Sequence, residues 1–116
     1  MPTILVVDDE RTIRTLVRLT LEPHGYDVVE AAGGAEALAL AEAHQPDLAL
    51  LDVALPQLSG LEVARRLGGR TPVLFLTGLS PDDEAIDGSG VRGSIEKPFS
   101  PATLLRRIEE ALESAA

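Results

Sequence analysis

The chain has 116 residues, 45% of them hydrophobic, which suffices for one domain with a buried core. Nineteen acidic residues against ten basic ones give a formal net charge of −9. This argues against nucleic-acid binding by the domain, because phosphate contacts need clustered lysine and arginine. The absence of cysteine excludes disulfides and thiolate metal sites. The apolar run at residues 4–7 is too short for a signal peptide or a membrane span, so we expect a cytoplasmic protein without membrane contact.

Short apolar runs alternate with amphipathic segments along the chain. The runs predict five strands, at Thr3–Val7, Tyr26–Glu30, Asp47–Leu51, Pro72–Leu76 and Val91–Ile95. The segments between and after them predict five helices, at Glu10–Glu22, Ala35–Ala43, Gly60–Leu67, Ser80–Asp87 and from Pro101 to about Glu113. Ser100 is the expected N-cap of the last helix. This order predicts an α/β fold: a (βα)5 sandwich of three layers, with a parallel sheet between helices.

The polarity of the runs also predicts the strand order. Residues 3–7, 47–51 and 72–76 are almost wholly apolar, as expected of strands buried on both faces of a parallel sheet. Tyr26–Glu30 and Val91–Ile95 carry polar residues and are better suited to the edges. The predicted order is therefore 2-1-3-4-5, the flavodoxin-like arrangement.

Polar residues follow the apolar strands at the point where each strand ends. Asp8 and Asp9 follow the first strand, Asp52 the third, Thr77 the fourth, and Glu96-Lys97 the fifth. The carboxyl ends of parallel strands lie at one edge of the sheet, where open α/β sheets place their reacting groups. We therefore expect these side chains to converge, with Asp52 central among them.

Clustered carboxylates repel one another and favour a bound cation. Two unit charges about 4 Å apart cost roughly 4 kcal/mol at an effective dielectric of about 20. The candidate ligands are all oxygens, which predicts a hard ion, Mg²⁺ or else Mn²⁺. Lys97 is the only lysine among the ten basic residues, and a compact cation suits a phosphate oxygen. Thr77 adds a hydroxyl donor.

Together these motifs resemble the receiver domain of bacterial two-component response regulators, over essentially the whole chain. The matching segments are Ile4–Glu10, Leu50–Asp52 with Pro56 and Gly60, Pro72–Gly78, and Lys97-Pro98-Phe99. By this resemblance Asp52 is the phosphoacceptor. Asp9, Asp52 and the backbone carbonyl of Ala54 would bind Mg²⁺, with Asp8 nearby through water. Thr77 and Lys97 would bind the phosphoryl oxygens, and the Lys97–Pro98 peptide would be cis.

The resemblance also implies the partners and the reaction. Asp52 would take its phosphoryl group from a phosphohistidine of a sensor histidine kinase or a phosphotransfer protein, and the phosphorylated state would alter binding to an output protein. The domain is not an enzyme in the usual sense, although it would catalyse its own phosphorylation and slow dephosphorylation. We expect a single receiver domain over residues 1–116, without an effector domain, as a monomer or weak dimer. Met1, two residues before the first strand, favours a natural start.

Two features depart from the family pattern. Ser94 stands where many receivers carry an aromatic that turns inward when the threonine moves, so we expect any activation signal to travel by loop and helix movement. The span from Thr77 to Lys97 is short and holds four glycines, so the helix at residues 80–87 should be brief or mobile. This helix belongs to the family's usual dimer surface, so the dimer does not transfer directly.

Other functions are open on the residues alone. A pseudo-receiver would use the same fold only for interactions, and a receiver fragment of a hybrid histidine kinase would share the sequence pattern. A dehalogenase-like phosphatase would need an acid where Ala54 stands, and a nucleotide-binding domain would need a glycine-rich loop after the first strand. Arg11, Arg14 and Arg18 form either a solvated stripe or a kinase-docking surface. His24 and His44 are expected at the surface without a chemical role.

Overall fold

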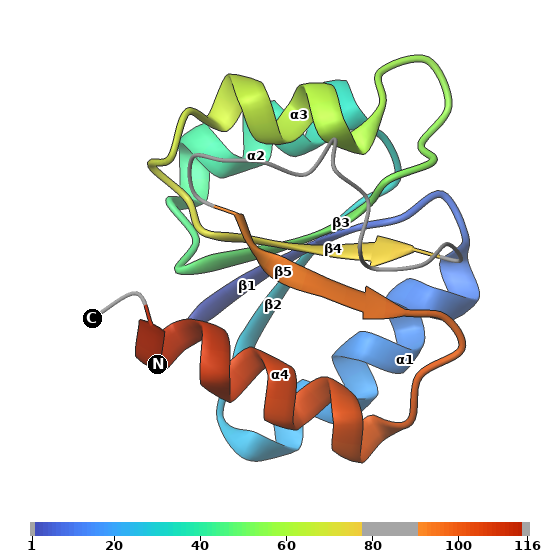
Figure 1. The fold of residues 1–116 in the computed structure, drawn as a ribbon, viewed down its shortest axis with the longest axis vertical. Coiled ribbons are helices and arrows are strands. Elements are labelled where there is room, and N and C mark those ends of the chain that lie inside the picture. Colours follow the sequence, from blue (N-terminus) through green and yellow to red (C-terminus); the bar gives the residue numbers. More distant parts are fainter. Residues whose placement is uncertain (1, 78–90, 115–116) are drawn as a thin grey trace.

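A five-stranded parallel sheet forms the middle layer of the computed structural model, which describes residues 2–77 and 91–114. Its strands are β1 (Thr3–Val7), β2 (Asp27–Ala31), β3 (Leu48–Asp52), β4 (Val73–Thr77) and β5 (Val91–Glu96). They lie in the order β2-β1-β3-β4-β5 (Figure 1). The predicted flavodoxin-like topology is confirmed. Every residue of β3 and β4 is buried, as a position inside a sheet covered on both faces requires.

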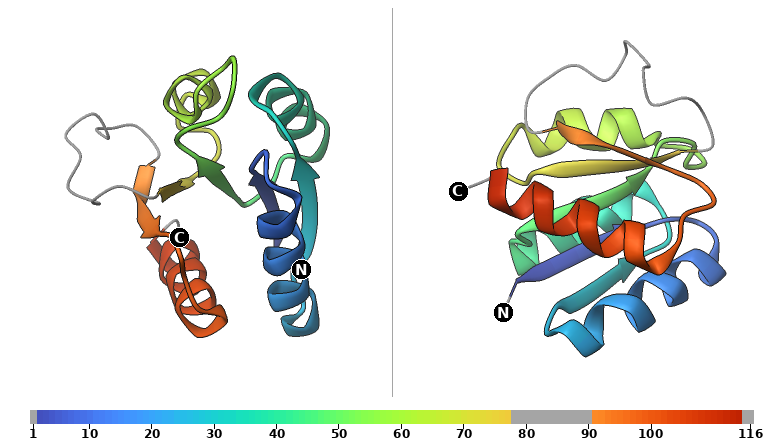
Figure 2. Two further views of the ribbon diagram at one scale, coloured as in Figure 1. Left: turned by 90° about the vertical axis from the view of Figure 1, so that its right-hand side faces the viewer. Right: turned by 60° about the horizontal axis from the view of Figure 1, so that its bottom comes forward.

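Helices cover both faces of this sheet. Helices α1 (Arg11–Leu21) and α4 (Pro101–Ser114) lie on one face, and α2 (Gly34–His44) and α3 (Gly60–Leu67) lie on the other (Figure 2). A short 3₁₀ turn, η1 (Glu22–His24), follows α1 and ends at Gly25, which has a positive φ of 91°. The helix predicted at residues 80–87 lies outside the described residues, so α4 corresponds to the last predicted helix. Its Ser100 N-cap is confirmed: the Ser100 hydroxyl oxygen accepts a hydrogen bond from the Thr103 amide at 3.1 Å.

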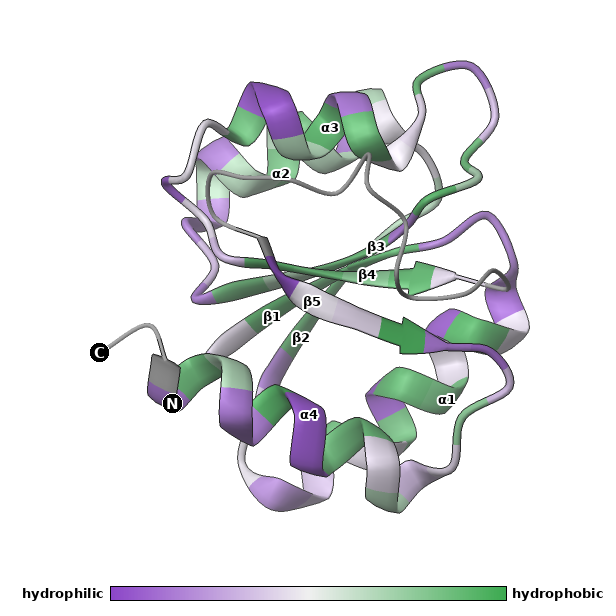
Figure 3. Cartoon of the chain, viewed as in Figure 1, coloured by the Kyte–Doolittle hydropathy of each residue, from purple (hydrophilic) through white to green (hydrophobic). Residues whose placement is uncertain are grey.

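The core consists of two apolar clusters separated by the sheet. Successive side chains of a strand point to opposite faces, so Ile4 and Val6 pack under α1 and α4, while Leu5 and Val7 pack under α2 and α3. Figure 3 shows the hydrophobic colouring along the central strands and on the helix surfaces facing them. Val17 of α1 and Leu104 and Ile108 of α4 are fully buried in the cluster on their face of the sheet.

Strand register brings the strand ends to one edge of the sheet. Val7 of β1 pairs with Leu51 of β3, Asp52 pairs with Leu76 of β4, and Thr77 pairs with Glu96 of β5. Four of the strands begin or end one residue later than predicted, which places Asp52 and Thr77 within β3 and β4 rather than just after them. The residues predicted to converge thus occupy neighbouring strand ends.

Candidate functional site

Lys97 makes direct contact with two of the predicted acids. Its Nζ lies 2.8 Å from Asp8 Oδ2 and 3.4 Å from Asp52 Oδ2. Glu10 Oε1 lies 4.0 Å from the same nitrogen. Residues 8, 52 and 97, widely spaced in the sequence, therefore form one cluster at the carboxyl edge of the sheet. The predicted convergence is confirmed for these side chains.

Asp8 is the most enclosed member of the cluster. Its side chain is fully buried, and its Oδ1 accepts a hydrogen bond from the Glu10 amide at 2.9 Å. Burial raises the pKa of Asp8, because a charged carboxylate loses hydration there, while the hydrogen bond from Lys97 acts in the opposite direction. Lys97 supplies the counter-charge that this buried acid needs.

Lys97 is held by its backbone and its charged neighbours. Its amide donates to the Thr77 carbonyl at 2.7 Å, which continues the β4–β5 ladder by one residue. The Lys97–Pro98 peptide is cis, as the resemblance implied. Burial by itself would lower the pKa of Lys97, but the hydrogen bond and charge of Asp8, joined by those of Asp52, raise it. The ammonium therefore stays protonated and carries a full charge beside Asp52.

Asp52 ends β3 with one carboxylate oxygen fixed by the following loop. The Ala54 amide donates to Asp52 Oδ1 at 3.0 Å, which leaves Oδ2 facing Lys97. The close approach of α3 helps to fix this loop: the Gly60 amide donates to the Val53 carbonyl at 3.1 Å. A Cβ on Gly60 would lie only 2.2 Å from the Asp52 carbonyl oxygen, so a larger residue does not fit without movement.

Three carboxylates could share a metal ion. One oxygen from each of Asp8, Asp9 and Asp52 lies within 4.8 Å of the other two. Asp9 is exposed, in contrast to the two buried acids, so the cluster opens to solvent on its side. The donors are all hard oxygens, and an exposed side is what Mg²⁺ needs to keep some of its water ligands. The residues present therefore fit a hard divalent cation.

Two predicted site features remain predictions. Thr77 is buried at the last position of β4, and its backbone oxygen accepts a hydrogen bond from the Lys97 amide; that its hydroxyl binds a phosphoryl oxygen stays a prediction. The Ala54 carbonyl is likewise an expected metal ligand only. Ser94, in place of the family aromatic, is buried in β5 beside Phe75 of β4. The segment 79–90, in which movement was predicted, lies outside the described residues.

The sequence did not predict a set of ion pairs between α1 and β2, next to the acidic cluster. Arg14 Nε lies 3.0 Å from Glu30 Oε1 and Arg18 Nε lies 2.7 Å from Glu30 Oε2, so two of the three arginines assigned to a stripe on α1 bind β2. Arg14 Nη1 also donates to the Asp8 carbonyl at 2.7 Å. The sequence held one indication of these contacts. Arg14 and Arg18 are four residues apart, so they lie on one face of their helix, and Glu30 is an acid at the end of the next predicted strand. His24 and His44 are exposed, as predicted.

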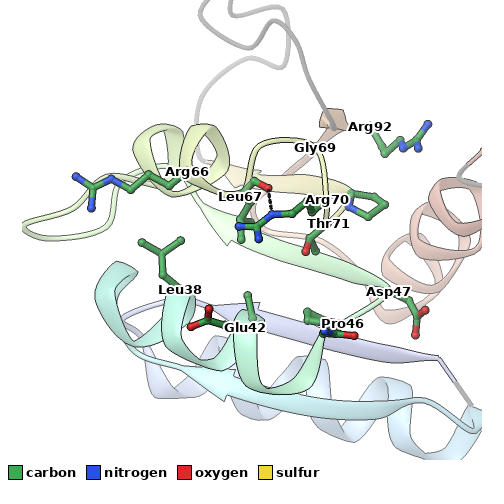
Figure 4. Close-up of a pocket in the computed structure, with 13 residues that line it drawn as sticks. Leu38, Glu42, Pro46, Asp47, Arg66, Leu67, Gly69, Arg70, Thr71 and Arg92 are labelled. Carbon is green, nitrogen blue, oxygen red and sulfur yellow. Dashed lines mark hydrogen bonds between the residues drawn. The ribbon is translucent and has the colours of Figure 1, made fainter.

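A separate concave surface lies at the other edge of the sheet. Its volume is about 1000 Å³, and it lies between the ends of α2 and α3, beside residues that precede β3 and β4 (Figure 4). Glu42, Arg66, Arg70 and Arg92 contribute charges of both signs there. Its strand-side residues, Asp47 and Pro72, stand at the amino ends of β3 and β4, whereas Asp52 stands at a carboxyl end. This surface is thus separate from the acidic cluster.

No helix among the described residues is long and apolar enough to cross a membrane.

Comparison with known proteins gives consistent relatives. The chain is 43% identical over 114 residues to the alkaline phosphatase synthesis transcriptional regulatory protein PhoP of Bacillus subtilis (strain 168), covering 94% of this chain and 48% of that protein. It is 41% identical over 117 residues to the phosphate regulon transcriptional regulatory protein PhoB of Pseudomonas aeruginosa, covering 95% of this chain and 51% of that protein. The chain thus spans about half the length of these relatives.

Solved structures agree with the sequence matches. The chemotaxis response regulator CheY4 of Vibrio cholerae superposes with a TM-score of 0.87 at 36% identity, covering 96% of this chain and 98% of that one. The family model of the response regulator receiver domain matches residues 4–109, which include all five strands apart from Thr3 and include the acidic cluster. This match, together with the shared topology and the strand-end residues, shows that the chain belongs to the response regulator receiver domain family of two-component signalling.

Proposed function

We propose that Asp52 accepts a phosphoryl group from a phosphohistidine of a sensor histidine kinase or of a phosphotransfer protein, in a Mg²⁺-dependent reaction. Receiver domains are signalling domains that interact with histidine kinases and use Mg²⁺ at an acidic pocket. The observation that carries the proposal is the placement of Asp52 Oδ2, which lies 3.4 Å from Lys97 Nζ while Oδ1 is held by the Ala54 amide. One carboxylate oxygen is therefore oriented toward a cation and the other is anchored.

The transfer needs little covalent chemistry from the protein. An Asp52 carboxylate oxygen forms a bond to phosphorus while the bond from phosphorus to the histidine nitrogen breaks, and the nitrogen keeps the electron pair and takes up a proton. Positioning and charge stabilisation provide most of the catalysis in such reactions. Lys97 would neutralise one phosphoryl oxygen, and the Thr77 hydroxyl would donate to another.

A bound Mg²⁺ would neutralise charge on the transferring group and on the acids. Asp9, Asp52 and the Ala54 carbonyl would hold it, with Asp8 linked through water. Asp8 is already bound by the Glu10 amide and Lys97, which suits an indirect role. The acyl phosphate would then hydrolyse slowly at the same site.

The phosphorylated state would alter binding to an output protein. Both relatives above are transcriptional regulators about twice as long as this chain, and their activity is a proposal only for any longer protein that contains it. For the 116 residues we propose one receiver domain whose net charge of −9 disfavours direct nucleic-acid contact. Buried Ser94, in place of the aromatic, favours signalling through loop and helix movement over ring burial.

Phosphorylation by acetyl phosphate tests the proposal. We expect the wild-type chain to gain one phosphoryl group with Mg²⁺ present and none with EDTA, as measured by intact-mass spectrometry. Asp52→Asn should abolish the gain, while Asp47→Asn, at the opposite edge of the sheet, should leave it unchanged. Absence of labelling in the folded wild-type chain would instead support a pseudo-receiver that acts by binding alone.

A further inference from the structure

Arg14 links the edge strand β2 to the acidic cluster. Its Nε lies 3.0 Å from Glu30 Oε1, and its Nη1 donates to the carbonyl oxygen of Asp8 at 2.7 Å. Only 16% of the Arg14 side chain is exposed. The guanidinium is planar and rigid, so binding Glu30 on one edge fixes the direction of the donor that reaches Asp8.

The Asp8 carbonyl belongs to the peptide that joins Asp8 to Asp9. The Asp8 side chain has its own anchors, the Glu10 amide and Lys97. The Asp9 side chain, by contrast, is exposed and makes no hydrogen bond or ion pair with another described residue. The direction of its carboxylate therefore depends on the backbone before it, and Arg14 is the side chain that holds that peptide.

Charge alone does not explain Arg14 at this position. A cation close to a divalent metal site would weaken metal binding by repulsion. Glu30, bound to both Arg14 and Arg18, offsets that charge locally. Nor is Arg14 needed merely to tie α1 to β2, because Arg18 also binds Glu30, at 2.7 Å, and donates to the Val28 carbonyl at 3.3 Å. The contact specific to Arg14 is the one with Asp8.

We infer that Arg14 is a positioning residue for the metal site: held by Glu30, it fixes the Asp8–Asp9 peptide so that the Asp9 carboxylate faces Asp52 before a cation arrives. The inference rests on the proposed function, because it assigns Arg14 a role in Mg²⁺ binding. Residues that orient metal ligands through hydrogen bonds commonly change metal affinity by about 10–100-fold when removed.

Mg²⁺ titration of Arg14→Ala against Arg18→Ala tests this role. Both variants lose an ion pair with Glu30, but only Arg14→Ala loses the contact with Asp8. By isothermal titration calorimetry we expect Arg14→Ala to bind Mg²⁺ about 10-fold more weakly than the wild-type chain, and Arg18→Ala to bind within about twofold of it, since Arg18 touches no member of the acidic cluster. Simple repulsion predicts the opposite sign, tighter binding by Arg14→Ala.

Phosphorylation by acetyl phosphate provides a second readout. In Arg14→Ala the Mg²⁺ concentration for half-maximal rate should rise, while the rate at saturating Mg²⁺ should return to the wild-type value. A defect in general folding would not show this pattern. If Arg14→Ala does not fold, Arg14→Lys carries the test, because lysine keeps the charge but lacks the rigid fork; it should bind Mg²⁺ more weakly than wild type.

The outcomes separate the two proposals. If the wild-type chain binds Mg²⁺ and is phosphorylated, but the folded Arg14 variant has unchanged or tighter Mg²⁺ binding, the positioning role is wrong and the proposed function stands. If Arg18→Ala weakens Mg²⁺ binding as much as Arg14→Ala does, the effect belongs to the ion-pair network and the specific role of Arg14 is also wrong. A wild-type chain that binds no Mg²⁺ would overturn the proposed function itself.

Discussion

At the scale of single residues, the site is a balance between one ammonium and several carboxylates. Lys97 directly contacts Asp8 and Asp52, and one oxygen from each of Asp8, Asp9 and Asp52 lies within 4.8 Å of the others. Asp9 has no cation of its own among the described residues. The cluster is thus short of positive charge until a divalent ion binds, and this shortage is itself the source of metal affinity.

Neutralising Asp9 should therefore stabilise the metal-free protein. We expect Asp9→Asn to raise the free energy of unfolding in EDTA, because it removes one of three neighbouring negative charges. Wild-type protein should gain further stability as Mg²⁺ is added, since a ligand bound to the native state adds RT ln(1 + [L]/Kd). Asp9→Asn should lose most of this gain.

Urea unfolding with and without Mg²⁺ measures both effects. Asp27→Asn, an exposed acid at the amino end of β2, removes the same charge away from the cluster and is the matched control. Equal stabilisation by both substitutions would show that overall net charge matters rather than the local repulsion proposed for Asp9.

At the scale of elements, the start of α3 sets the loop after Asp52. Ser59 is the N-cap, with its hydroxyl oxygen accepting from the Glu62 amide at 3.2 Å, and Gly60 lies directly against the Asp52 carbonyl. The helix can begin this close to β3 because residue 60 has no Cβ. Helix position and the geometry of the Asp52–Ala54 turn are consequently coupled.

Gly60→Ala should disturb both stability and phosphorylation. The added Cβ would lie 2.2 Å from the Asp52 oxygen, so backbone must shift, at an expected cost of about 1–3 kcal/mol. The shift should also slow phosphorylation of Asp52. Gly33→Ala is the control: Gly33 precedes α2, and an added Cβ there has nothing within 4 Å.

The control should lower the unfolding free energy by no more than about 1 kcal/mol, the cost of alanine in place of glycine at the N-cap of α2, and should leave the phosphorylation rate unchanged. Thermal unfolding and the acetyl phosphate rate, measured on both variants, compare the two sites. An unaffected rate in Gly60→Ala would show that the loop absorbs the shift without moving the carboxylate.

At the scale of the whole molecule, the sheet separates two apolar clusters that must form together. Ile108 of α4 lies in one and Val63 of α3 lies in the other, and both are fully buried. Both clusters pack against the same strands, one on each face, so neither can form without the sheet. This arrangement favours a single cooperative unfolding transition.

The losses of unfolding free energy caused by core substitutions on the two faces should therefore be additive. We expect Ile108→Val to cost about 1 kcal/mol and Val63→Ala about 2 kcal/mol. The double variant should lose their sum to within about 0.5 kcal/mol, because residues without shared partners rarely couple. Urea unfolding checks this sum, and two separate transitions in the double variant would contradict the shared sheet as the common unit.

Much of the architecture could be predicted from patterns that depend on neighbouring residues only. The unbroken apolar runs of β1, β3 and β4 predicted central strands, and the mixed polarity of β2 and β5 predicted edges. The inner face of α2 was harder to predict: Ala37 and Ala41 are buried while Leu38 is only partly buried, because the many alanines on that helix give little contrast between its faces.

The sequence by itself determined the fold and which residues meet at the sheet edge, because strand polarity decides strand order and parallel strands end on the same side. Only the tertiary structure decided how those residues are bound. The contact of Lys97 with Asp8 depends on where the end of β5 lies relative to β1, and the contact of Arg14 with the Asp8 carbonyl depends on where α1 packs against the sheet. Packing of whole elements sets these positions, and no short pattern of residues encodes them.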